Sequence, residues 1–301
     1  MIQYWKSIGQ IFTIDNSNQY LITHASNPLA IHLYSDVFRI FYSGRDVHNK
    51  SSVGFVDIDI VSGYIVNYPK EPVFIFGNDS SFFSHGVSIG NKYEVGENSY
   101  ILFMGWQVED GQHWRGDIGR LLLKDSTLKA TSCFPFLSVD EEDKVSLSYP
   151  WVIKHDNIFK MWYGSTISWS SENDEMIHVI KYATSVDGEN WIRHGIAIPF
   201  ELGVAQAFSR PCVIVNSLGF HMWYSYRSGT GEKYRIGYSF SKDGLIWERK
   251  HEDFHFSVST NGWDSEMICY PFVFGHKDKL YMLYNGNSYG KYGFGMSVLD
   301  N

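Results

Sequence analysis

Apolar and aromatic residues alternate with polar residues in short runs along this chain, and the runs are separated by turns. The clearest unit is the segment 220–247. Within it, 220–226 and 234–240 alternate with the period of two that is typical of half-buried strands. A polar loop separates these runs, and a Ser-Lys-Asp-Gly hairpin signal at 241–244 leads into a further strand at Trp247. The pattern predicts antiparallel strands joined by short turns.

This unit is repeated with a period near 60 residues. The copies of its first strand lie at 38–44, 100–106, 159–164, 220–226 and 280–285. Met161, Met222 and Met282 occupy equivalent places, 61 and 60 residues apart, and Tyr42 and Met104 are 62 apart. Repetition at a fixed period of this length is the signature of a repeat architecture. Five units of four antiparallel strands predict an all-β, five-bladed β-propeller that occupies residues 1–301 as a single domain.

The two ends of the chain are expected to meet. Residues 5–9 resemble 191–195, which form the last strand of a unit, whereas the final unit stops at residue 301 without such a strand. The N-terminal strand is therefore expected to complete the last blade, which closes the ring and removes an exposed edge. Four units carry a proline before an apolar strand, and we expect these prolines at strand starts, where they break no ladder bond. The prolines are Pro28, Pro150, Pro211 and Pro271.

Composition narrows the function. Apolar residues make up 44% of the 301 residues, and the net charge of −8 provides no basic surface for nucleic acid or an anionic membrane. The N-terminus lacks the apolar core of a signal peptide, so we expect a cytoplasmic protein. Cys133, Cys212 and Cys269 lack metal-ligand spacing and are expected to be free thiols. No zinc-binding, phosphate-loop or nucleophile-elbow motif occurs, so no metal or cofactor is expected. The oligomeric state stays undetermined.

Residues that are distant in sequence converge in a propeller. The N-terminal end of each innermost strand and the loop between the second and third strands of each blade face the same mouth of the central channel. The residues expected there are His24, Asn27, Arg45, Asp46, His85, Trp106, Tyr149, Arg210, Arg227, Asp264, Glu266, Tyr270 and Asn285.

Other conspicuous residues are expected to be structural. Asp187 and Asp243, in the two Ser-x-Asp-Gly turns, are expected to bond backbone amides. Tryptophans that recur at repeat positions are expected to pack between blades, whereas Trp106, Trp169, Trp263 and Tyr289 could stack on sugar rings. The glycine-rich stretch 286–295 lies between two predicted strands and indicates a hairpin.

The chain resembles a known group of enzymes. Its five repeats, two of which carry the hairpins at 185–191 and 241–247, resemble the five-bladed propellers of glycoside hydrolase families 43, 32 and 130. Four segments are similar to a branch associated with bacterial surface-polysaccharide genes, namely 41–46, 223–227, 263–267 and 284–287. The resemblance implies a carbohydrate-active enzyme whose partner is a sugar, glycan or sugar phosphate. Family 43 places an acidic residue in each of the first three blades, where this chain has Asn27, His85 and Tyr149.

Glycosidic cleavage normally requires two carboxyl groups, one protonated and one ionised. The pair available here is Glu266 with Asp46 or Asp264. Glu266 precedes apolar Met267, where partial desolvation would favour use as a general acid. The alternative is that Asp264 and Glu266 are turn residues at the entry of a blade.

Three arginines predict the charge of the ligand. Arg45, Arg210 and Arg227 are expected at one mouth, and a guanidinium group matches a carboxylate or phosphate. They indicate an anionic sugar, a sugar phosphate or a nucleotide-activated sugar, unless each pairs with a neighbouring acid. A non-catalytic glycan-binding or scaffold propeller is the rival function, which the absent family 43 acids favour.

Overall fold

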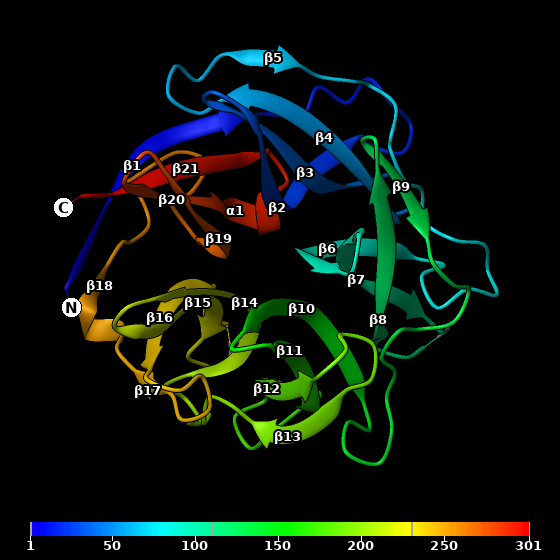
Figure 1. The fold of residues 1–301 in the computed structure, drawn as a ribbon, viewed down its shortest axis with the longest axis vertical. Helices are drawn as coiled ribbons and strands as arrows, with labels where there is room; N and C mark the ends of the chain where they lie inside the picture. The colour runs from blue at the N-terminus through cyan, green and yellow to red at the C-terminus, as the bar shows by residue number, and fades with distance from the viewer. Residues whose placement is uncertain (1, 110, 230, 301) are drawn as a thin grey trace.

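Antiparallel strands arranged in a ring around a central axis form the structure, a computed structural model that describes residues 2–109, 111–229 and 231–300 (Figure 1). The first two groups of strands are β2 (Thr23–Tyr34), β3 (Val37–Arg45), β4 (Ser51–Asp59) and β5 (Ile65–Asn67), then β6 (Gly86–Val95), β7 (Asn98–Val108), β8 (Trp114–Lys124) and β9 (Thr127–Ala130). The next two are β10 (Ser146–His155), β11 (Ile158–Ser168), β12 (Ile177–Ser185) and β13 (Ile192–Ile196), then β14 (Gln206–Asn216), β15 (Gly219–Arg227), β16 (Arg235–Ser241) and β17 (Glu248–Arg249). The last comprises β19 (Cys269–His276), β20 (Lys279–Asn285), β21 (Phe294–Asp300), β1 (Gln3–Phe12) and β18 (Phe254–His255).

The first two groups belong to one eight-stranded sheet, which is joined between β4 and β6 only by the parallel pair Ser51–Gly86 in the described chain. Dividing the sheet at this pair leaves five groups, and we call each group a blade. The prediction of an all-β propeller is confirmed. The short helical segments η1 (His251–Asp253) and α1 (Asn287–Gly290) lie in connections. In the described residues, no helix has the length and apolar character needed to cross a bilayer.

The predicted closure of the ring is confirmed. β1 pairs antiparallel with β21 from Tyr4–Asp300 to Phe12–Phe294, so the N-terminal strand lies in the sheet formed by the end of the chain (Figure 1). β18 then adds to the outer side of β1 in parallel. This pairing covers backbone groups of β21 that would otherwise form an open edge.

Each innermost strand carries at least one extra residue relative to its neighbour, and one such bulge recurs at an equivalent place in all five. The recurring shifts in pairing fall between Ser26 and Leu29, Ile89 and Lys92, Ser148 and Trp151, Ser209 and Cys212, and Cys269 and Phe272. Four of these bulges contain a residue with positive φ followed by proline: Asn27 (56°), Tyr149 (40°), Arg210 (49°) and Tyr270 (55°). The prolines therefore lie inside strands, not at strand starts as expected. A bulge leaves a residue unpaired, so the missing N–H costs no ladder bond, and it redirects the neighbouring side chain.

Aromatic residues at repeat positions fill the space between blades. Trp162 and Trp223 are fully buried, and their rings meet those of Trp247 and Trp5 edge-on at centroid distances of 5.8 and 6.1 Å. The carboxylate of Asp187 accepts hydrogen bonds from the backbone amides of residues 189 and 190, and the turn at Asp243 has the same arrangement. Both structural predictions are confirmed.

Candidate functional site

Two adjoining cavities lie where the N-terminal ends of the innermost strands meet the loops between second and third strands. The outer cavity has a volume of about 600 Å³, and its lining includes Thr23, His24, Asp46, Arg227, Glu232, Lys233, Glu266, Ser288 and Lys291. The inner cavity has a volume of about 250 Å³, and its lining includes Arg45, Ser88, Met104, Trp106, Trp114, Tyr149, Met176, His178, Ser209 and Tyr270. Tyr234 and Tyr289 line both, so the two cavities form one continuous site.

The structure brings together most of the predicted site residues. Those that line a cavity are His24, Arg45, Asp46, Trp106, Tyr149, Arg227, Glu266 and Tyr270. Those that line neither are Asn27, His85, Arg210, Asp264 and Asn285. The position of each of this second group has a physical reason.

The side chain of Arg210 is buried near the central axis of the ring and is not accessible to a ligand. Its side chain, only 2% exposed as a residue, crosses from β14 to the bulges of two other blades. There its guanidinium donates hydrogen bonds to the carbonyl oxygen of Pro28 at 2.6 Å and to that of Ile89. Burial lowers the pKa of Arg210 to about 10. The prediction that Arg210 holds an anionic sugar is therefore wrong: it ties three innermost strands together.

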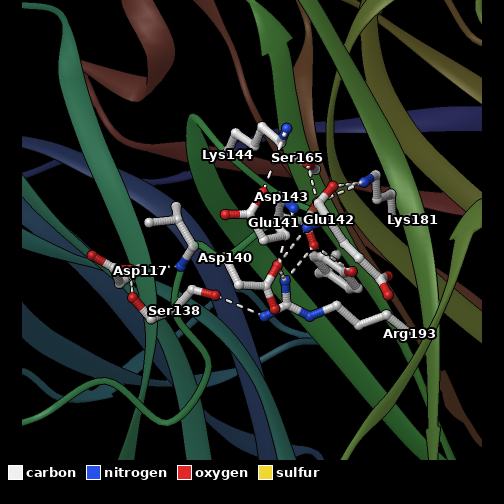
Figure 2. Close-up of polar contacts among 12 residues, drawn as sticks. Asp117, Ser138, Asp140, Glu141, Glu142, Asp143, Lys144, Ser165, Lys181 and Arg193 are labelled. Carbon is white, nitrogen blue, oxygen red and sulfur yellow. Dashed lines mark hydrogen bonds and ion pairs between the residues drawn. The ribbon is translucent and has the colours of Figure 1, made fainter.

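Asp264 is a buried structural acid. It is 2% exposed, and its carboxylate accepts a hydrogen bond from Tyr284 Oη at 2.9 Å. The same pair recurs two repeats earlier, where Asp143 accepts from Tyr163 Oη at 2.9 Å. Figure 2 shows that Asp143 also meets Lys181 and Arg193, at 2.8 Å each. A residue that anchors the entry of more than one blade has a packing role, so the prediction of Asp264 as a catalytic residue is not supported.

Asn27 and Asn285 bridge the first and last blades. The backbone amide of Asn27 donates to Asn285 Oδ1 at 2.9 Å, and Asn285 Nδ2 donates to the carbonyls of Ala25 and Gly293, both at 2.9 Å. Both asparagines are buried. Their predicted contact with substrate is corrected to a role in ring closure. His85 likewise lines neither cavity, and its Nδ1 accepts a hydrogen bond from the backbone amide of Val108 at 3.3 Å.

Positive charge concentrates where the two cavities meet. Arg45, at the end of β3, has no ion-pair partner within the part of the chain that the structure describes. Thr23 pairs with Arg45 across β2 and β3, and the amide of His24 donates to the carbonyl of Lys291 at 3.1 Å, so these residues are held side by side. Burial, followed by the charges of Arg45 and Lys291, lowers the pKa of His24 to about 3. His24 is therefore neutral, in a positive field that favours an anion.

Arg227 is already paired, unlike Arg45. Its guanidinium contacts the Glu175 carboxylate at 2.6 Å and lies 4.8 Å from the ring centroid of Tyr234. Glu175 is buried and also accepts from the amide of Met176 at 2.9 Å. Arg227 therefore forms the structural ion pair that was the alternative to ligand binding. Of the three predicted arginines, only Arg45 lines a cavity without an ion-pair or hydrogen-bond partner for its guanidinium in the described chain.

The carboxylates at the mouth belong to the outer cavity. Glu266 is exposed, and Asn287 Oδ1 accepts its backbone amide at 2.8 Å. Asp46 closes the β3–β4 turn, because its Oδ1 accepts the amides of His48 and Lys50, both at 2.8 Å. Glu232 is a further exposed carboxylate on the same wall. Among the described residues that line the inner cavity, none is acidic.

The inner cavity is aromatic with polar edges. The hydroxyls of Tyr149 and Tyr270, both on bulges, lie 3.4 Å apart, and burial raises the pKa of each. His178 bonds to Ser148 Oγ at 2.7 Å and to Thr166 Oγ1 at 2.8 Å, and burial lowers its pKa to about 4. The wall is thus neutral apart from Arg45. It suits a sugar ring, which presents C–H groups to aromatic faces and hydroxyls to polar atoms.

Sequence reasoning missed several lining residues. Lys291 lies in the glycine-rich stretch 286–295, which indicates a hairpin, although it connects the second and third strands of the last blade. Because loops between the second and third strands of a blade face the mouth of the channel, Lys291 could have been expected there. Tyr289, in the same stretch, is a residue that was expected to stack on a sugar ring, and it lines both cavities. Tyr234 immediately precedes β16 and His178 lies on β12, both third strands of their blades, and no sequence signal separates them from core residues. Among the described residues, no group of three or more His, Cys, Asp or Glu side chains could hold a metal ion.

The ring of sheets places the chain in the class of β-propeller folds found in glycoside hydrolases and related phosphorylases. It matches a glycosyl hydrolase from Bacteroides ovatus with a TM-score of 0.75 and 12% identity, over 99% of this chain and 94% of the other. It also matches a β-1,2-mannobiose phosphorylase from Listeria innocua, with a TM-score of 0.70 and 11% identity over 99% and 96% of the two proteins. These identities establish the shared fold alone.

Two sequence relatives define the family. Uncharacterized protein MT1551 and Uncharacterized protein Rv1502, from Mycobacterium tuberculosis strains CDC 1551 / Oshkosh and ATCC 25618 / H37Rv, are each 38% identical over 300 residues. The match covers 99% of this chain and 99% of each relative. The chain therefore belongs to the family of these two proteins. No protein-family model matches it.

Proposed function

We propose that this protein is a carbohydrate-active enzyme that acts on a glycosidic bond of an anionic or phosphorylated sugar. One observation carries the proposal: an aromatic cavity whose one charged lining residue in the described chain, Arg45, has no ion-pair partner there opens directly into a cavity lined by Glu266 and Asp46. The first cavity suits a charged sugar, and the second supplies carboxyl groups. The fold shared with glycoside hydrolases and mannoside phosphorylases supports this class of chemistry.

Arg45 and Lys291 would bind the anionic group of the sugar. A guanidinium presents parallel N–H donors that match a carboxylate or phosphate, and Lys291 adds a second charge. Tyr149, Tyr270 and Tyr289 would surround the ring. An anion at this place would also reverse the positive field at His24, so His24 would bind a proton more readily once the ligand is present.

Glu266 would act as the proton donor. Its carboxyl proton would pass to the leaving glycosidic oxygen as the bond from that oxygen to the anomeric carbon breaks. In hydrolysis a water oxygen attacks the anomeric carbon, and Asp46 would accept the proton from that water. In phosphorolysis a phosphate oxygen attacks instead, and no base is required, because the nucleophile is already ionised. Hydrolysis is our first proposal, and transfer to phosphate or another sugar differs only in the acceptor.

A non-catalytic glycan-binding propeller is the second candidate. It is favoured by the absence of acidic residues from the described lining of the inner cavity and by the two backbone bonds that Asp46 Oδ1 already accepts. Both candidates predict binding, and only the first predicts turnover. In either case we propose a cytoplasmic location, which is compatible with the free thiols of Cys133, Cys212 and Cys269.

A thermal-shift screen against uronic acids, sugar phosphates and nucleotide sugars tests binding, because a ligand that binds only the folded state raises its Tm. Glu266→Gln should then abolish bond cleavage, measured as release of reducing sugar, while the ligand-induced Tm shift persists. Glu97→Gln, an exposed carboxylate in the β6–β7 turn, is the matched control and should retain activity. Binding without turnover in the unmodified protein would favour the second candidate. No response to any anionic sugar would refute the assignment of Arg45.

A further inference from the structure

A third cavity continues the site on the side opposite the outer cavity. It is a groove of about 260 Å³ between the second and third blades, lined by residues that include Gln107, His113, Trp114, Arg115 and Trp169. Trp114 also lines the inner cavity, so the groove and the inner cavity meet at its side chain.

Loop geometry brings the aromatic residues of the groove together. Trp114 begins β8 after the β7–β8 connection, and Trp169 follows β11 in the connection to β12. Both connections join the second and third strands of a blade, so both face the mouth. The ring centroids of Trp114 and Trp169 lie 4.8 Å apart at an interplanar angle of 72°, and Trp169 stacks on His113 at 4.8 Å and 20°.

These tryptophans differ from those that hold the blades together. Trp162 and Trp223 occupy repeat positions and are fully buried, whereas Trp114 and Trp169 lie outside the repeat pattern and are partly exposed. A partly exposed indole leaves part of its apolar surface in contact with water, so it contributes less to the stability of the fold than a fully buried one. Such a ring, beside the polar ends of Gln107 and Arg115, matches a saccharide, which has apolar C–H faces and hydroxyls at its rim.

We propose that the groove of Trp114 and Trp169 is a second saccharide subsite, so that the ligand is an acidic oligosaccharide or the end of an acidic polysaccharide, not a free sugar phosphate. This inference rests on the proposed function, because the inner cavity must hold the first, charged sugar. The charged unit lies at Arg45, and the next unit crosses Trp114 and stacks on Trp169. The continuous outer cavity, inner cavity and groove leave room for a chain across the mouth.

The test is a binding titration with a panel of acidic glycans, each supplied as the monosaccharide, disaccharide and trisaccharide, including the oligogalacturonate and oligoglucuronate series. Affinity of the unmodified protein should rise about tenfold or more from the monosaccharide to the longer members. Trp169→Ala should remove that gain and leave monosaccharide affinity unchanged, and Trp169→Phe should restore much of it. Tyr64→Ala, which removes an exposed aromatic residue in the first blade, is the control and should behave as the unmodified protein.

Each other outcome is decisive. Equal affinity for the monosaccharide and the longer glycans would overturn the subsite while leaving the proposed function intact. Loss of monosaccharide and oligosaccharide binding together in Trp169→Ala, with Trp169→Phe no better, would also overturn it, because Trp169 would then be supporting the fold of the mouth. If no member of the panel binds but a sugar phosphate or nucleotide sugar raises the Tm in the thermal-shift screen, the subsite fails and the proposed function stands. If neither the panel nor the screen gives binding, both fail.

Discussion

Replacing Arg210 with methionine tests whether Arg210 stabilises the fold or binds the ligand. The substitution removes two hydrogen bonds from a charged donor, to the carbonyls of Pro28 and Ile89, and each such bond contributes about 1.5–3 kcal/mol. The guanidinium is itself costly to bury, as its lowered pKa shows, and methionine regains apolar contact. We therefore expect a net loss of about 2–4 kcal/mol in the free energy of unfolding.

Arg45→Met is the matched comparison. Arg45 has no ion pair in the described chain, so its loss should change the free energy of unfolding by no more than about 0.5 kcal/mol. Removing a charged hydrogen-bond donor from the anion site should weaken binding by about 2–3 kcal/mol, or about 30–150-fold in Kd. Arg210→Met, once folded, should keep its affinity.

The assay combines urea unfolding, followed by tryptophan fluorescence, with calorimetric titration of the anionic sugar that gives the largest Tm shift in the screen. Arg210→Lys is a second structural variant. It keeps the positive charge, but a single ammonium group does not reproduce the planar fork that reaches two carbonyls, so intermediate stability is expected. The reasoning is refuted if Arg210→Met unfolds like the unmodified protein and loses the ligand.

Three further predictions concern the ring and its buried groups. Asn285→Ala, which deletes two hydrogen bonds between the first and last blades and one within the last blade, should lower the free energy of unfolding by about 2–4 kcal/mol in the same urea assay, and an unchanged midpoint would contradict the bridging role. Deletion of residues 1–12 removes β1 from the last blade and should lower the Tm sharply or prevent folding, which size-exclusion chromatography and calorimetry would detect. Burial lowers the pKa values of His24, His178 and His251 from about 6.5 to about 3, 4 and 4, so each is neutral in the folded state at pH 7. Below about pH 6.5 the unfolded chain binds protons that the folded protein does not, so the free energy of unfolding falls as the pH falls towards 4 and 3. Urea midpoints at pH 7 and pH 5 measure this loss, and His178→Gln should reduce it.

Local patterns in the sequence were sufficient for the architecture. The strand period, the repeat near 60 residues and the match of residues 5–9 to 191–195 predicted the propeller and its closure, because each blade is a short-range unit. The Asp187 turn and the packing of Trp162 were predictable for the same reason, since each repeats and depends on nearby residues.

Only the tertiary structure decided which residues form the site. Arg45 and Arg210 are alike as residues, yet one lines a cavity and the other bonds to Pro28, 182 positions away in the chain. Asp264 and Glu266 are two residues apart, but the fold of the loop before β19 buries the first and exposes the second. Where a side chain points at a bulge or a loop depends on the blades across the axis. The direction of such a side chain is therefore set by the packing of segments distant in sequence, not by its sequence neighbours.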